Sequence, residues 1–211
     1  MSRILPYNAK QWEVRAILYG RKTVTRRLIK PEPQRYFEVN EEPLYIYDTD
    51  FQQGRIMPPY QPGDILYVRE TWERFDCCSC EGDEHGNCPK EPKKSVLDKS
   101  IGCYMYRSTD EISGDAKWHP SIHMPKEAAR IFLKVKDVRV ERLQDITEKQ
   151  VQKEGIDVCD GVHRGYSDGI EMFEELWNCT IKKSDLDRYG WDANPWVWVI
   201  EFERCEKPED F

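Results

Sequence analysis

Four cations and two threonine hydroxyls lie within the eight residues Gly20–Arg27. Guanidinium and ammonium groups beside hydroxyls suit a phosphate or a polar, nucleotide-like ligand. We therefore predict that Arg21, Thr23, Arg26 and Arg27 contribute to a nucleotide-binding site. The alternative is a solvated basic turn without a ligand, because short motifs of this kind are weak evidence by themselves.

A second group, Lys22, Thr25 and Glu154, has the chemistry of an acyl-transfer site. A threonine hydroxyl is a poor nucleophile unless a base takes its proton. Lys22 stands three residues before Thr25 and suits that task if burial favours its neutral form. Glu154 ends a predicted helix, where the helix dipole disfavours a negative charge, and a carboxylic acid there could protonate a leaving amine. Sequence spacing alone does not bring Glu154 to the other two residues.

A third group of residues has the types and part of the spacing of a zinc site. Cys77, Cys80, His85 and Cys88 supply four soft ligands within twelve residues, and Cys78 or Cys103 could replace one of them. Two cysteines separated by two residues can bind one Zn²⁺, and His with a further Cys completes a tetrahedron. A site with all four positions filled would be structural. The alternative is a reduced Cys-rich loop without metal.

The charge of the chain is unevenly distributed. Residues 10–36 hold eight Lys or Arg and two Glu, a net charge of +6, so the remainder carries −13 of the total of −7. A basic patch on an acidic protein indicates a local anionic partner and not general adhesion to nucleic acid. The other interpretation is that these cations pair with acidic residues from elsewhere in the fold.

Length and composition limit the class of protein. A chain of 211 residues with seven Trp, eleven Tyr and seven Phe can bury a real core as one large domain or a domain with insertions. The sequence has no run of eighteen apolar residues and no apolar N-terminal region of signal-peptide length, so we expect a cytoplasmic protein with no membrane span. The eight cysteines are then thiols or metal ligands before they are disulfides.

The elements that must position these groups follow from hydrophobic periodicity and from start and stop signals. Helical patterns cover about 9–19, 148–154 and 170–177, the second beginning at a capping box and ending at Gly155. Strand-like runs cover 23–29, 44–47, 65–68, 103–107, 131–135, 138–140 and 195–203. The remainder of 34–60 and the polar stretch 184–194 are expected to be irregular. Several strands with two or three helices between them favour an α+β fold, a small mixed β-barrel with flanking helices.

A strong turn signal at residues 60–64 precedes the apolar run 65–68. The run is expected to be a buried strand that ends at Arg69 and Glu70. Either charged side chain could face a ligand cleft, and Glu70 is included among the predicted nucleotide-binding residues. The alternative for Glu70 is a structural ion pair. Residues 72–120, which include the Cys-rich stretch, and residues 30–60 are expected to be insertions into a single domain.

Four segments in order resemble the ASCH domain, a PUA-like family. They are Gly20-Arg21-Lys22-Thr23-x-Thr25-x-Arg27, Pro62-Gly63-Asp64-x-Leu66, Leu143-x-x-Ile146-Thr147-Glu148 with Glu154, and Val199-Ile200-Glu201-Phe202. The stretch Trp118-x-Pro120-Ser121-Ile122-His123-Met124-Pro125 is similar to prophage-encoded members. The resemblance implies a small β-barrel with flanking helices and an RNA-associated function.

One bacterial branch of that family is an amidohydrolase that deacetylates N(4)-acetylcytidine. By this distant resemblance Lys22 would be the proton acceptor, Thr25 the nucleophile and Glu154 the proton donor. The chain is about twice as long as that compact enzyme, so its insertions could cover the cleft.

Three hypotheses follow. The protein is an amidohydrolase acting on an acylated cytidine, a non-catalytic module that binds RNA or a modified nucleoside, or a zinc-stabilised phage accessory protein whose insertion docks a protein partner.

Overall fold

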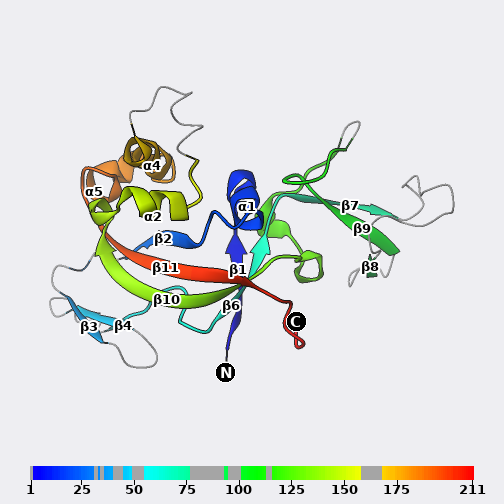
Figure 1. Ribbon diagram of the computed structural model, residues 1–211, viewed down its shortest axis with the longest axis horizontal. Helices are drawn as coiled ribbons and strands as arrows, with labels where there is room; N and C mark the ends of the chain where they lie inside the picture. The colour runs from blue at the N-terminus through cyan, green and yellow to red at the C-terminus, as the bar shows by residue number, and fades with distance from the viewer. Residues whose placement is uncertain are drawn as a thin grey trace. The chain divides into compact units, whose positions relative to one another are not determined.

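The computed structural model describes residues 2–30, 33, 36–39, 45–48, 55–76, 93–94, 101–112, 116–157 and 168–211 (Figure 1). They form a mixed α+β fold. The strands are β1 Ile4–Asn8, β2 Val24–Leu28, β3 Tyr36–Val39, β4 Tyr45–Asp48, β5 Arg55–Ile56, β6 Ile65–Arg69, β7 Trp72–Asp76, β8 Lys93–Lys94, β9 Ile101–Tyr106, β10 Phe132–Arg142 and β11 Trp196–Cys205. The helices are α1 Gln11–Leu18, α2 Glu148–Lys153, α4 Gly169–Asn178 and α5 Leu186–Tyr189, with short 3-10 turns η2 Ser121–His123, η3 Lys126–Ala128, η4 Leu143–Asp145 and η5 Lys183–Asp185.

The chain divides into two compact units. Unit 1 comprises Met1–Leu5, Ala16–Ile65 and Leu133–Arg204, and unit 2 comprises Pro6–Arg15, Leu66–Phe132 and Cys205–Phe211. No helix in the described part of the chain is long and apolar enough to cross a membrane.

The largest sheet has five strands in the order β1-β6-β10-β11-β2. In the described residues no pairing joins β1 to β2, so the closed barrel predicted from the sequence is not found and the sheet is open. The central strands β10 and β11 have eleven and ten residues, whereas the two edge strands have five each. Short strands at both edges limit the exposed row of unpaired backbone groups.

Two helices of unit 1 cover one face of this sheet, as Figure 1 shows for α2 and α4. Val24 on β2 with Val197 and Val199 on β11 forms a single hydrophobic cluster with side chains of the helices, including Val151, Phe173 and Trp177. Because successive side chains of a strand point to opposite faces, this set of residues on β2 and β11 points toward the helices. This core holds the end of α2 close to β2.

Helix α2 begins and ends where the sequence predicts. The side chain of Thr147 accepts from the Gln150 N–H, the Gln150 side chain accepts from the Thr147 N–H, and both bonds of the capping box are present. The helix ends before Gly155, which has a φ of +90°. Two predictions nearby were wrong. The strand pattern at 131–140 is one continuous strand, β10, because no turn residue separates its two halves, and the polar stretch 184–194 contains α5.

Unit 2 contains a three-stranded sheet in the order β7-β9-β8. Strands β7 and β9 pair antiparallel with Trp72 opposite Tyr106, and the Trp72 ring packs against Tyr104 and His119 at centroid separations of 5.7 and 4.9 Å. The strand β7 was not predicted, because charged residues interrupt its apolar pattern. Strands β3 and β5 of unit 1 were also missed, and they pair with the predicted β4.

The turn before β6 is built as its sequence indicates. The Asp64 N–H donates to the Gln61 carbonyl at 3.0 Å, and Gly63 adopts a φ of +87°, as a Pro-Gly turn of type II requires. The buried Asp64 carboxylate accepts from the Gln61 N–H at 2.7 Å and from Arg3 Nε at 3.0 Å, and it forms an ion pair with the Arg3 guanidinium. Burial raises the pKa of Asp64, but the bonds from Arg3 and Gln61 together lower it below its usual value.

Replacing Asp64 by Asn should destabilise the fold in a pH-dependent way. Because the folded-state pKa of Asp64 is lowered, its ionised form stabilises the protein above the unfolded-state pKa, and this contribution disappears as the pH falls through the folded-state value. We expect a loss of about 2 kcal/mol at neutral pH that vanishes in acid. Denaturant unfolding of both proteins between pH 7 and pH 3 measures it, and a difference independent of pH would contradict the assignment.

Candidate functional site

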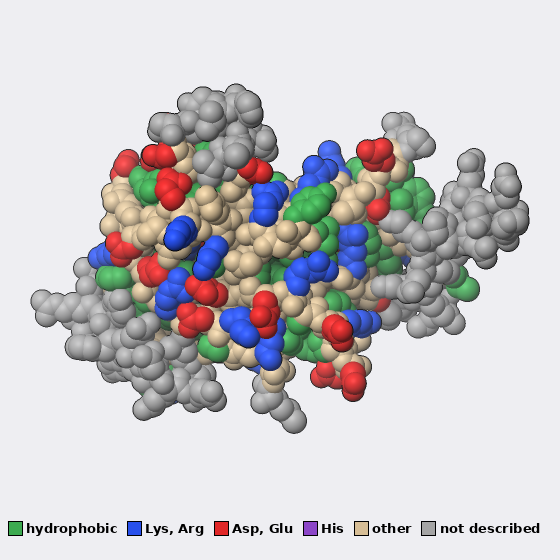
Figure 2. Space-filling model, in the orientation of Figure 1, with side chains coloured by type: hydrophobic (Ala, Val, Ile, Leu, Met, Phe, Trp, Pro, Cys, Tyr) green, Lys and Arg blue, Asp and Glu red, His purple; other side chains and the backbone are tan. Residues whose placement is uncertain are grey.

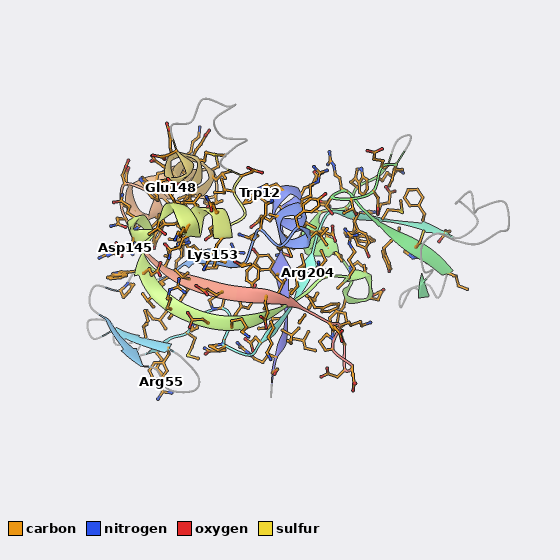
Figure 3. The ribbon with its side chains drawn as sticks, viewed as in Figure 1. Trp12, Arg55, Asp145, Glu148, Lys153 and Arg204 are labelled. Carbon is orange, nitrogen blue, oxygen red and sulfur yellow. The ribbon has the colours of Figure 1, made fainter. Side chains whose placement is uncertain are left out.

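Residues 132 positions apart in the chain meet at the end of α2. Helix α1 ends in a tight turn, in which the Lys22 N–H donates to the Ala16 carbonyl at 3.0 Å and Gly20 has a φ of +72°. Lys22 then forms an antiparallel bridge with Glu154, and the Thr23 N–H donates to the Lys153 carbonyl at 2.8 Å. In Figure 3, Glu148 and Lys153 mark the two ends of α2 and so locate Glu154 directly after it.

The side chains of Lys22 and Glu154 form a buried ion pair. Lys22 Nζ lies 2.9 Å from Glu154 Oε2, and it also donates to the Glu154 carbonyl at 2.9 Å and to the Val24 carbonyl at 3.0 Å. The two side chains are 2% and 6% exposed. An ammonium has three N–H donors, so these three acceptors match the protonated form of the lysine.

Arg26 extends this ion pair into a network. Its NH1 donates to Glu154 Oε1 at 2.9 Å and its NH2 to Glu141 Oε2 at 3.2 Å. Arg139 Nε in turn donates to Glu141 Oε1 at 2.6 Å. Cations and carboxylates therefore alternate from Lys22 to Arg139 across the end of α2, β2 and β10, and each buried charge faces an opposite one.

Gly155 is required for this close approach. A Cβ atom at Gly155 would lie 2.7 Å from the Cβ of Ala16 and 2.8 Å from the Cβ of Lys22, and the positive φ already favours glycine. Only a residue without a side chain lets the end of α2 meet the turn that precedes β2. The stop signal noted in the sequence thus also places Lys22 against Glu154.

Thr25 lies on a different face of β2. In the pairing of β2 with β11, Val24 and Arg26 stand opposite Glu201 and Val199, while Thr25 stands opposite Ile200. Val24 and Val199 belong to the hydrophobic cluster beneath α2 and α4. Because successive side chains of a strand alternate, the buried Thr25 projects from the face opposite Arg26. The structure brings Lys22, Arg26 and Glu154 together and places Thr25 apart from Arg26.

A groove of about 660 Å³ lies along the edge strand β2 in unit 1. Its described lining includes four cations, one acid and two tryptophans. They are Arg26, Arg27, Lys30, Lys182, Asp185, Trp177 and Trp198. The remaining lining is largely apolar. Arg26 belongs to both the groove and the buried network, so the two features share a wall.

The other predicted ligand-binding residues are distributed more widely. Arg21 is half exposed and pairs with Asp157 at 3.3 Å, and Arg27 lines the groove. Thr23 is partly buried at the start of β2. Glu70 lies in unit 2, where its carboxylate accepts from Arg130 Nε at 2.8 Å and from Arg130 NH2 at 3.0 Å, and it also contacts the Ser108 hydroxyl.

The predicted zinc ligands Cys77, Cys80, His85 and Cys88 lie outside the described residues, so the zinc site stays a prediction. Within the described ranges no group of three or more His, Cys, Asp or Glu side chains is arranged to hold a metal ion.

Several functional candidates were missed in the sequence. Lys182 and Trp177 come from the α4 region, and only the fold brings them to β2. Glu141 gave one weak signal, a charged residue at the end of a strand-like run. On the face shown in Figure 2, basic and acidic side chains are interspersed.

Comparisons with known proteins add little to this site. No family model matches the chain, and no curated protein matches it either. A solved structure, an ASCH domain from Lactobacillus crispatus JV V101, matches with 13% identity over 96% of this chain and 79% of that chain, at a TM-score of 0.36. A TM-score this low establishes no shared fold, so the functional argument depends on the site itself.

Removing the buried cation should cost far more than removing an exposed one. Replacing Lys22 by Met leaves part of the Glu154 charge without its partner, and we expect a loss of about 3 kcal/mol in the free energy of unfolding. Replacing Lys136 by Met is the control, because its 3.0 Å pair with Glu203 is about half exposed and should cost less than about 1 kcal/mol. Equal losses in denaturant unfolding would show that the Lys22 pair is not structurally important.

Proposed function

We propose that unit 1 binds a nucleotide, either free or within RNA, in the groove along β2. The observation that carries this proposal is the composition of the groove. In the described lining, Lys30 and Lys182 against the acid Asp185 favour a phosphate, and the apolar side chains, among them the exposed Met57, favour a base. The volume of about 660 Å³ lies in the usual range of small-molecule sites.

The cations that line the groove differ in whether their charge is available to bind a phosphate. Lys30 Nζ lies 4.6 Å from the centre of the Tyr189 ring, which fixes its position without neutralising its charge. Lys182 is exposed at the start of η5. Both supply positive charge at the rim, whereas the charge of Arg26 is already offset by Glu141 and Glu154. The rim is therefore the part of the groove that would bind phosphate.

Binding of a short RNA should depend on salt and on Lys182. Replacing Lys182 by Ala should weaken binding and reduce the slope of log affinity against log salt by about one, because one phosphate contact is lost. Replacing Lys136 by Ala removes the same charge outside the groove and should change neither quantity. Filter binding across a salt series measures both. Affinity insensitive to salt in the wild-type protein would exclude phosphate contacts.

Hydrolysis of an acyl group from a modified cytidine is a second candidate function, favoured by the 2.9 Å contact between Lys22 Nζ and Glu154 Oε2. In this reaction the Thr25 hydroxyl attacks the acyl carbon and Lys22 accepts its proton. Glu154 protonates the departing amine. Water then releases the acyl group from Thr25. The reaction requires Lys22 to exchange its present acceptors for the Thr25 hydroxyl.

The hydrolysis hypothesis has a direct test. Incubation of the wild-type protein with N(4)-acetylcytidine should release acetate, replacement of Thr25 by Ala should abolish the release, and replacement by Ser, which keeps the hydroxyl, should retain part of it. Acetate is measured enzymatically against a protein-free blank. If the wild-type protein releases none, it does not catalyse this reaction, and if the Ala variant is as active as the wild type, Thr25 is not the nucleophile.

A further inference from the structure

One nitrogen of the Arg26 side chain has no hydrogen-bond partner. NH1 donates to Glu154 and NH2 to Glu141, but Nε is buried and has no hydrogen-bond partner. The side chain is 1% exposed. A buried N–H without an acceptor destabilises the fold, and nearly all buried N–H groups in folded proteins have a partner. Arg26 is part of the groove lining, so a ligand atom that displaces the side chains covering Nε would supply the missing acceptor.

The surroundings of Arg26 determine which ligand atom suits it. The carboxylates of Glu141 and Glu154 already offset its charge, and the Phe173 ring lies 5.9 Å from the guanidinium carbon. A phosphate at Nε would meet the repulsion of both carboxylates in a poorly hydrated site. A neutral acceptor gains the hydrogen bond without that repulsion. Arg26 thus differs from Lys30 and Lys182, which suit an anion.

We propose that Arg26 Nε donates a hydrogen bond to a carbonyl oxygen of the base of the bound nucleotide. The phosphate then lies toward Lys30 and Lys182, so the groove has a base end and a phosphate end. Glu141 and Glu154 are positioning residues in this arrangement, because they bind NH1 and NH2 and leave Nε as the nitrogen of this guanidinium without a partner. The inference depends on the proposed nucleotide-binding function and names the ligand class, a nucleotide whose base carries a carbonyl.

The test compares two ligands in two proteins. Cytidine 5′-monophosphate carries the base and ribose 5-phosphate lacks it, and calorimetry at low salt measures the affinity of each. Replacing Arg26 by Lys keeps a cation for the two carboxylates but removes the Nε donor. We expect the variant to bind cytidine 5′-monophosphate roughly 10- to 100-fold more weakly and ribose 5-phosphate with unchanged affinity.

The outcomes separate this inference from the proposed function. If the wild-type protein binds neither ligand, the nucleotide-binding function itself fails. If it binds both but the Arg26→Lys variant loses affinity for both equally, the function stands and the role of Arg26 is refuted. The Lys136→Ala variant is the control for general effects of surface charge.

A second measurement needs no variant and so does not depend on the folding of Arg26→Lys. Uridine 5′-monophosphate is compared with its 2-thio and 4-thio analogues on the wild-type protein, because sulfur is a poorer acceptor than oxygen. We expect one of the two analogues to bind more weakly, which also identifies the carbonyl that meets Arg26. Equal affinity for all three nucleotides would overturn the inference.

Discussion

The contact between Lys22 and Glu154 is the constraint on which the site depends. Two charges that are almost completely buried lose their hydration, and the ion pair stabilises the fold only if the remaining donors and acceptors are also satisfied. Here the ammonium has three acceptors and the carboxylate also binds Arg26. The same contact fixes the end of α2 against the turn before β2, and Gly155 gives it the necessary space. The hydrogen bond to Glu154 in turn orients the Arg26 side chain.

The hydrogen bonds of this network also favour nucleotide binding over hydrolysis as the proposed function. A lysine that acts as a base must be neutral, and a neutral amine has one N–H fewer than the ammonium that satisfies the three acceptors. Hydrolysis therefore requires a rearrangement of the buried network, and Thr25 would have to be reached from the face of β2 opposite Arg26. Binding along the groove requires no such change. This asymmetry is why binding is the first proposal and hydrolysis the second.

Local signals in the sequence predicted local structure well. The capping box at Thr147, the stop at Gly155 and the Pro-Gly turn before β6 were predictable because each depends on residues a few positions apart. The contact of Lys22 with Glu154 depends on packing between distant segments, and the resemblance suggested it where spacing could not. The sequence predicted a closed barrel, but the sheet is open. This prediction failed because the periodicity of a single segment does not determine how many strands a sheet has or in which order they pair. The alternation of side-chain directions along β2 was predictable from its strand pattern. It alone would have placed the side chains of Thr25 and Arg26 on opposite faces of the sheet.

Unit 2 shows why burial of a charge is not by itself evidence of a site. Glu70 is as buried as any side chain of the network, yet both of its oxygens accept from Arg130 and one also contacts Ser108. Arg130 is further held over the Tyr106 ring at 3.9 Å, and its NH2 donates to Thr109 at 2.9 Å. Such a pair has hydrogen-bond partners for both carboxylate oxygens without a ligand. Arg26 differs because it belongs to the groove lining and its buried Nε has no hydrogen-bond partner.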